Sequence, residues 1–236
     1  MTLYDRIASF YDPWSRSVTE DVAFYVDQAL ASGGPVVELA VGTGRIAVPI
    51  AEAGISVIGI DSSPEMLAIA HAAAEAAGVA ALLDLRVGDL RAPPVPERVP
   101  LAICPFRSLL HMETEGDKLR ALTAARGLVE PDGKFIFDVF APSREDIVET
   151  HDRWFEREPG IFERAAWDEG TRTLSLSVRS GDSRATFGLH WLSAHEWLRL
   201  LDEAGFEVEQ LYGWFDSRLY EDEEDMVFIC RRRSER

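Results

Sequence analysis

The sequence has little of several features that would each point to a particular class of protein. Only two of its 236 residues, Cys104 and Cys230, are cysteines, and both lie in apolar runs where a free cysteine usually behaves as a small buried hydrophobe. No apolar run approaches the roughly 20 residues that span a bilayer. The amino terminus carries Asp5 and Arg6 and lacks the apolar stretch of a signal peptide. We therefore expect no disulfide framework, no membrane association and a cytoplasmic location.

Positive charge is also scarce. The chain has 24 Lys and Arg residues against 41 Asp and Glu residues, which gives a formal net charge of -17. Such a surplus repels the phosphates of nucleic acids, and only residues 231–233 form a compact basic run. The histidines and cysteines show no spacing typical of a metal site. We therefore expect a small-molecule partner, with neither nucleic acid nor a bound metal ion.

Strand-like and helical segments alternate over the first 140 residues. Apolar residues recur at helical spacing in four segments, 19–31, 46–53, 63–77 and 116–129. Apolar runs of strand length lie at 36–41, 55–61, 82–88, 99–104 and 134–140, the last of them after a turn at 131–133. This alternation predicts an α/β fold with a parallel sheet.

The pattern changes after residue 150. Polar and apolar residues alternate over 172–179 and over 184–191, and Gly181 and Asp182 supply a tight turn between the two runs. We expect a small antiparallel β insertion at 150–192. We further expect it to form a lid over the active site, where its tryptophans suit an apolar or aromatic ligand. Because the hairpin is amphipathic, the sequence also allows a homodimer.

The last part of the chain returns to the earlier alternation. Ser193 suits the start of a helix that Gly205 ends, and strand-like runs follow at 206–212 and 226–231. The length of the chain fits one domain with an insertion, so we expect a single domain over residues 1–236.

The loop after the first strand carries Gly42 and Gly44, where a ligand can approach the backbone without meeting a Cβ atom. Two acids follow at the ends of the next two strands. Asp61 is placed to accept the hydroxyl groups of a ribose, and Asp89 to accept from an adenine amino group. The stretch 42–47 also fits the G-x-G-x-x-A form of a dinucleotide site, so an NAD(P)-dependent oxidoreductase is an alternative.

Glu38 favours one of these two interpretations. It lies on the strand that leads into the glycine loop, where an anion would disfavour a pyrophosphate but would suit a ligand with a sulfonium and an ammonium group. Each acid taken alone also fits a helix cap or a solvated turn.

Three motifs resemble the class I S-adenosylmethionine (SAM)-dependent methyltransferases of the small-molecule type. These motifs are ELAVGTG at 38–44, GIDSSPEML at 59–67 and VGDL at 87–90. The resemblance implies a Rossmann-like fold with a seven-stranded, mostly parallel sheet whose final strand is antiparallel. It also implies SAM as cofactor and S-adenosylhomocysteine (SAH) as product.

The resemblance assigns cofactor contacts residue by residue. Gly42 and Gly44 would pass the methionine part of SAM, Asp61 would hold the ribose, and Met66 would pack on the adenine, whose edge Asp89 would frame. Ala40 departs from the family pattern, which often has glycine there. The full predicted set is Tyr11, Glu38, Ala40, Gly42, Thr43, Gly44, Asp61, Ser62, Met66, Gly88, Asp89, Leu90, Pro105 and Phe106.

Two further segments also resemble the family. The start, YDRIASFYD at 4–12, is similar to a segment that covers the cofactor, which places Tyr11 near the methionine carboxylate or the acceptor. In CPFRSLLH at 104–111, Phe106 would flank the cofactor, and His111 would face the cleft as a general base. The alternatives are a hydrophobic contact for Tyr11 and a structural role for His111.

These observations lead to one main hypothesis. The chain is expected to transfer a methyl group by in-line displacement from SAM to a nitrogen or oxygen of a small molecule, with Tyr11 and His111 as catalytic residues. The alternatives are the NAD(P)-dependent oxidoreductase and a non-catalytic SAM-binding protein.

Overall fold

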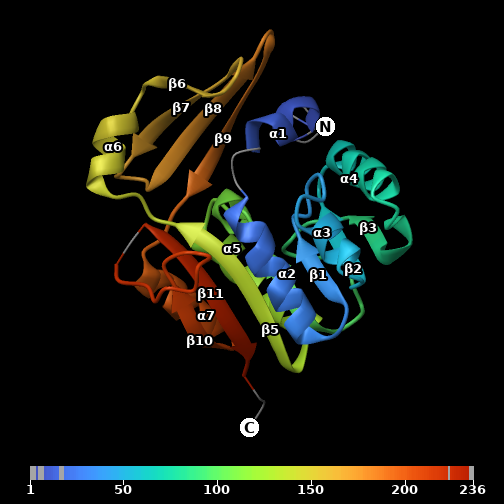
Figure 1. The fold of residues 1–236 in the computed structure, drawn as a ribbon. Helices are drawn as coiled ribbons and strands as arrows, with labels where there is room; N and C mark the ends of the chain where they lie inside the picture. Colours follow the sequence, from blue (N-terminus) through green and yellow to red (C-terminus); the bar gives the residue numbers. More distant parts are fainter. Residues whose placement is uncertain (1–3, 5–7, 16–18, 223, 234–236) are drawn as a thin grey trace.

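The computed structural model describes residues 4, 8–15, 19–222 and 224–233 (Figure 1). Residues 5–7, which belong to the predicted cofactor-covering segment and include Asp5 and Arg6, lie outside the described residues. No helix in the described ranges is long and apolar enough to cross a membrane.

A seven-stranded sheet in the order β10-β11-β5-β4-β1-β2-β3 forms the centre of the molecule. The five strands from β5 to the edge strand β3 pair in parallel, whereas β11 pairs antiparallel with both β5 and β10. The predicted fold class is therefore confirmed. The strands are β1 (Val36–Leu39), β2 (Val57–Asp61), β3 (Leu83–Val87), β4 (Val99–Cys104), β5 (Val129–Phe140), β10 (Phe206–Tyr212) and β11 (Asp225–Arg232).

Helices cover both faces of this sheet, because the strands between them are apolar on both sides. Phe135 and Phe137 of β5 share one core cluster with residues of α5 and α7, whereas Ile136 between them belongs to the cluster beneath α2 and α3. Cys104 and Cys230 are both free and buried, as expected. The helices are α1 (Ala8–Ser15), α2 (Glu20–Ser32), α3 (Ala47–Glu52), α4 (Pro64–Ala76), α5 (Glu115–Leu128), α6 (Arg144–Thr150) and α7 (Ala194–Ala204), with short 3-10 turns η2 (Ala80–Leu82) and η3 (Ser108–His111).

The predicted insertion forms a separate four-stranded antiparallel sheet in the order β6-β7-β8-β9. Its strands are β6 (Trp154–Glu158), β7 (Ile161–Asp168), β8 (Thr173–Ser180) and β9 (Ser183–His190). The β8–β9 hairpin is the predicted one, β6 and β7 are two further strands within the predicted range 150–192, and the helix α6 begins before this range. Figure 1 shows this sheet standing beyond the carboxyl end of β5, with α1 beside it.

The turn predicted at residues 131–133 is wrong as a boundary, because β5 runs from Val129 to Phe140 without a break. The register of β4 and β5 instead shifts between the pairs Val99–Val129 and Leu101–Lys134. Between these pairs β5 has more residues than β4, and they form an irregularity within the strand. Gly133 makes this possible, since a Cβ atom there would lie 3.0 Å from the carbonyl oxygen of Val99.

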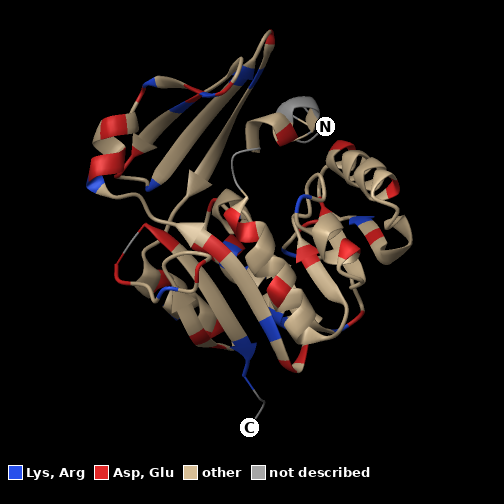
Figure 2. Cartoon of the chain, viewed as in Figure 1, with Lys and Arg blue, Asp and Glu red and all other residues tan. Residues whose placement is uncertain are grey.

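The acidic surplus is spread over the whole fold. Figure 2 shows Asp and Glu on helices at both faces of the main sheet and on α6, next to the small sheet. The excess of acids is therefore a property of the whole surface and does not mark one site.

Candidate functional site

A cavity of about 480 Å³ opens at the carboxyl ends of the parallel strands, between the main sheet and the small sheet. This is the edge at which ligands bind in open α/β sheets. Eleven of the predicted site residues line it: Tyr11, Ala40, Gly42, Asp61, Ser62, Met66, Gly88, Asp89, Leu90, Phe106 and His111.

The bend after β1 forms the floor of one half of this cavity. Ala40 has a φ of 59° and Gly42 a φ of 56°, so both adopt the left-handed region. Glycine adopts this region freely, whereas an alanine there brings Cβ close to the following carbonyl oxygen. The departure from the family pattern at Ala40 thus strains the backbone, beyond adding a methyl group.

Asp61 is fixed at the end of β2 by two backbone N–H groups. The N–H of Gly42 donates to Oδ2 over 2.9 Å, and the N–H of Ser63 donates to Oδ1 over 2.8 Å. Ser63 also caps α4 by accepting from the N–H of Met66. Asp61 also lines the cavity, which is the position that the predicted ribose contact requires.

Glu38 is 2% exposed and lies behind the cavity wall, outside the lining itself. Its Oε2 atom has no hydrogen-bond partner among the described residues. Burial raises the pKa of this carboxyl group well above its usual range; Arg45 opposes the shift, and the nearby Asp21 and Asp61 reinforce it. A buried carboxyl group with an unused oxygen beside two further acids suits a cationic ligand.

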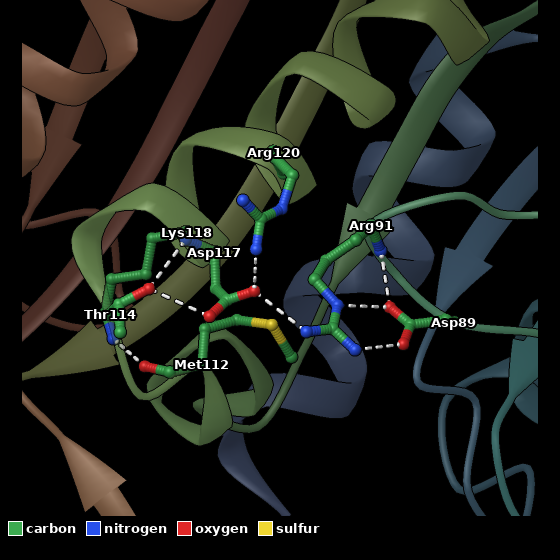
Figure 3. A network of polar contacts seen from close by, with 7 residues as sticks. All are labelled: Asp89, Arg91, Met112, Thr114, Asp117, Lys118 and Arg120. Atoms are coloured by element: carbon green, nitrogen blue, oxygen red, sulfur yellow. Dashed lines mark hydrogen bonds and ion pairs between the residues drawn. The ribbon is translucent and has the colours of Figure 1, made fainter.

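Asp89 forms the opposite end of the cavity, at the carboxyl end of β3. Its Oδ1 accepts from the backbone N–H and from Nε of Arg91, and its Oδ2 accepts from Nη2 over 2.5 Å. Arg91 also donates to Asp117 on α5, which Arg120 and Thr114 bind as well (Figure 3). The bonds from Arg91 hold the pKa of Asp89 below its usual value. Asp89 is therefore a fixed anion, and its contact with an adenine stays a prediction.

His111 lies beneath the small sheet and is bonded to Tyr4. The Tyr4 hydroxyl lies 2.6 Å from Nε2 of His111, and the imidazole also bonds to the backbone of Gly188. Burial, with a smaller contribution from Lys118, lowers the pKa of His111 to about 4. The imidazole is therefore neutral at neutral pH and a weak base, so the predicted role as general base stays a hypothesis.

Phe106 follows β4 and faces the cavity beside Tyr11, with ring centroids 6.4 Å apart. Phe106 and Arg107 both have left-handed φ values, of 58° and 60°. The carboxylate of Asp138 accepts the backbone N–H groups of both residues, over 2.8 and 3.0 Å.

Four of the predicted residues do not line the cavity: Glu38, Thr43, Gly44 and Pro105. Thr43 turns away and donates to Asp12 over 2.5 Å, and the backbone of Gly44 packs closely against Ala70 of α4. Thr43 and Gly44 therefore stabilise the conformation of the loop without facing the cavity. No group of three or more side chains able to hold a metal ion lies within the described residues.

The sequence interpretation missed several lining residues. Asp138 is the one with an available signal, since it is a single acid inside the apolar run FIFDVF near the end of a predicted strand. Others come from the small sheet, where Leu176, Phe187 and Leu189 face the cavity, and further ones are Glu20, Asp21, Arg107, Ser108 and Met112. Alternation alone does not show which face of a hairpin packs on the site.

Comparisons with known proteins agree with this geometry. Residues 36–133 match a family model described as a methyltransferase domain. Over 248 aligned residues the chain is 25% identical to the glycine/sarcosine/dimethylglycine N-methyltransferase of Actinopolyspora halophila, an alignment that covers 99% of this chain and 43% of that enzyme. A separate alignment of 140 residues with YqeM of Bacillus subtilis (strain 168) shows 26% identity and covers 58% of this chain and 53% of YqeM. The chain thus spans about half the length of these two relatives.

Solved structures share the fold over the whole chain. The CcbJ methyltransferase from Streptomyces caelestis superposes with a TM-score of 0.85 at 24% identity, covering 99% of both chains. SAM-bound CalS10, an amino pentose methyltransferase from Micromonospora echinaspora, gives a TM-score of 0.68 at 18% identity, covering 98% of this chain and 97% of that one. At these identities the likeness shows the fold alone.

Proposed function

We propose that this chain, which belongs to the class I SAM-dependent methyltransferase family, transfers the methyl group of SAM to a small molecule whose acceptor atom is an amine nitrogen. SAM supplies a methyl group on a sulfonium, which is already a good leaving group. The main task of the protein is therefore to bind and orient SAM and the acceptor and to exclude water, rather than to activate the leaving group.

The half of the cavity near β1, β2 and β3 suits SAM. Asp61 would accept hydroxyl groups of the ribose, Met66 offers an apolar surface for the adenine, and Gly42 a bare backbone for the methionine part. Oε2 of the buried Glu38, which has no hydrogen-bond partner among the described residues, would carry negative charge behind the bend once the cationic part of SAM favours ionisation of this carboxyl group. Asp89 and Leu90 would frame the adenine edge.

The other half suits an acceptor with an apolar body. Its lining is mainly aromatic and aliphatic and includes Trp14, Leu176, Phe187, Leu189, Trp214 and Phe215. We propose that the insertion at 150–192 acts as a lid that keeps water from the reacting atoms. Tyr4, Tyr11 and His111 would lie on the acceptor side.

The contacts of His111 favour nitrogen over oxygen, because its Nε2 atom lies 2.6 Å from the Tyr4 hydroxyl. A hydroxyl group must lose its proton to become a strong nucleophile, whereas a neutral amine already has a reactive lone pair. His111 is a weak base whose Nε2 already faces Tyr4, and Asp138 already accepts three hydrogen bonds. The geometry of His111 and Asp138, among the residues that the structure describes, therefore supports an amine acceptor. The Actinopolyspora halophila relative is an N-methyltransferase and CalS10 is an amino pentose methyltransferase, which agrees with this choice.

Calorimetric titration with SAH and with NADH, followed by mass spectrometry of reactions with matched amine and hydroxyl compounds, tests the proposal. We expect SAH to bind, NADH not to bind, and amines alone to gain one methyl group. Binding of NADH without SAH would support the oxidoreductase. SAH binding without methylation of any compound in a broad panel would support a non-catalytic SAM-binding protein. A matched Asp61→Asn variant should lose SAH affinity.

A further inference from the structure

We propose that Asp138 is a positioning residue for methyl transfer, which together with Tyr25 holds the Phe106–Arg107 turn so that Phe106 faces the reacting centre. The inference rests on the proposed function only in that this centre is the SAM site. The four residues lie on three different elements: α2, the loop after β4, and β5.

The turn itself is unfavourable. Phe106 and Arg107 are consecutive non-glycine residues with φ values of 58° and 60°. In this region Cβ crowds the following carbonyl oxygen, so such residues usually occur singly and persist only where their surroundings hold them. Something outside the loop must therefore stabilise two of them in a row.

Asp138 supplies that stabilisation. Its Oδ1 accepts the N–H of Phe106 over 2.8 Å, and its Oδ2 accepts the N–H of Arg107 over 3.0 Å. One carboxylate thus binds the two successive N–H groups that this conformation points in the same direction, an arrangement typical of an anion held by a backbone concavity. The side chain is 5% exposed, so the bonds are protected from water.

Tyr25 fixes the carboxylate in turn. Its side chain is fully buried, and its hydroxyl donates to Oδ1 of Asp138 over 2.7 Å. One helical turn earlier on α2, Asp21 binds Arg45 through both of its oxygens, over 2.7 and 2.5 Å. The Arg45 guanidinium lies 4.8 Å from the centre of the Phe106 ring. The helix α2 therefore anchors the turn in two ways. Tyr25 holds its backbone by way of Asp138, and Asp21 holds the ring of Phe106 by way of Arg45.

The consequence is a defined orientation of Phe106. Its ring packs against the Arg45 guanidinium and meets the Tyr11 ring at an interplanar angle of 83°, and Phe106 lines the cavity that would hold the cofactor. Asp138 also lines the cavity, so a direct contact with the acceptor is the rival explanation. If Asp138 positions the turn, relief of the backbone strain at residue 107 should compensate for the loss of the carboxylate. If Asp138 contacts the acceptor directly, relief of this strain should not compensate for it.

SAH affinity, measured by calorimetry, separates them without knowledge of the acceptor. We expect Asp138→Asn to weaken SAH binding about tenfold or more, because the amide cannot accept both N–H groups, and Tyr25→Phe to weaken it about threefold. In the Asp138→Asn background, Arg107→Gly should restore most of the affinity, since glycine adopts the left-handed region freely. Arg107→Ala in the same background is the matched control and should restore none, because it removes the same guanidinium but keeps Cβ.

Each outcome is decisive. Wild-type affinity in folded Asp138→Asn, or equal behaviour of the glycine and alanine double variants, would overturn the proposal. If Asp138→Asn does not fold, Tyr25→Phe alone and combined with Arg107→Gly or Arg107→Ala gives the same comparison. A wild-type protein that does not bind SAH would instead refute the proposed function.

Discussion

The hydroxyl group of Tyr4 lies 2.6 Å from Nε2 of His111, although 107 positions separate the two residues in the chain. The rings meet edge to face at 5.4 Å, and Phe187 of β9 packs against both. Because burial keeps His111 neutral, its unprotonated ring nitrogen can accept a hydrogen bond from the Tyr4 hydroxyl group. The hydroxyl oxygen of Tyr4 then offers a lone pair to the cavity.

Tyr4→Phe should therefore impair the acceptor side of the reaction. The phenylalanine keeps the ring packing but removes an acceptor for the N–H group of an amine, so we expect kcat/KM to fall about tenfold while SAH affinity stays unchanged. Steady-state kinetics and SAH titration measure the two quantities. Ser177→Ala is a control, since it removes a buried hydroxyl bond to Thr186 outside the cavity lining. An equal loss in SAH affinity would instead place Tyr4 on the cofactor.

Glu38 should couple SAM binding to proton release. Burial raises the pKa of this carboxyl group and so favours its protonated form in the free protein, whereas an arriving cation favours the ionised form. We therefore expect a positive number of protons to be released per SAM bound. Calorimetry in buffers of different ionisation enthalpy measures this number. Glu38→Gln should release none, and an equal release from that variant would assign the proton to another group.

Ala40→Gly should stabilise the protein. Glycine removes the left-handed strain at φ 59°, which costs about 1 to 2 kcal/mol, and loses part of that gain to the greater freedom of the unfolded chain. We expect a net increase of about 0.5 to 1 kcal/mol in the free energy of unfolding by urea. Ala72→Gly, at an exposed position inside α4, is the matched control and should destabilise by about 1 kcal/mol. If both substitutions destabilise equally, the bend after β1 is not strained.

Features that depend on local sequence were predictable. The strands of the main sheet follow from apolar runs bounded by glycine turns, and Asp61 and Asp89 follow from their place at strand ends. The helix α6 was missed because it is short, and none of its residues is buried, so it has no apolar face.

Features that depend on distant contacts were not predictable. Asp138 gains its role from Tyr25, 113 positions away, and from Phe106, 32 positions away. Thr43 and Gly44 match the family motif, yet the fold turns them to the rear of the loop, because the register of the bend decides which side faces the ligand. Local pattern located the site, and tertiary contacts determined which of its residues line the cavity.

The stability of the wild-type protein relative to Asp138→Asn should depend on pH in an unusual direction. Burial raises the pKa of Asp138 to about 6, although the hydrogen bond from Tyr25, the charge of Arg107 and the N–H group of Phe106 oppose the shift. The folded state therefore holds a proton that the unfolded chain, with a pKa near 3.9, has already lost. This contribution to stability is present at about pH 4 and is lost as the pH rises through 6. Asparagine does not titrate, so we expect the wild type to lose roughly 2 kcal/mol relative to the variant between pH 4 and pH 8, measured by urea unfolding. A gain in relative stability between pH 4 and pH 8 would show that the three hydrogen bonds to Asp138 lower its pKa by more than burial raises it.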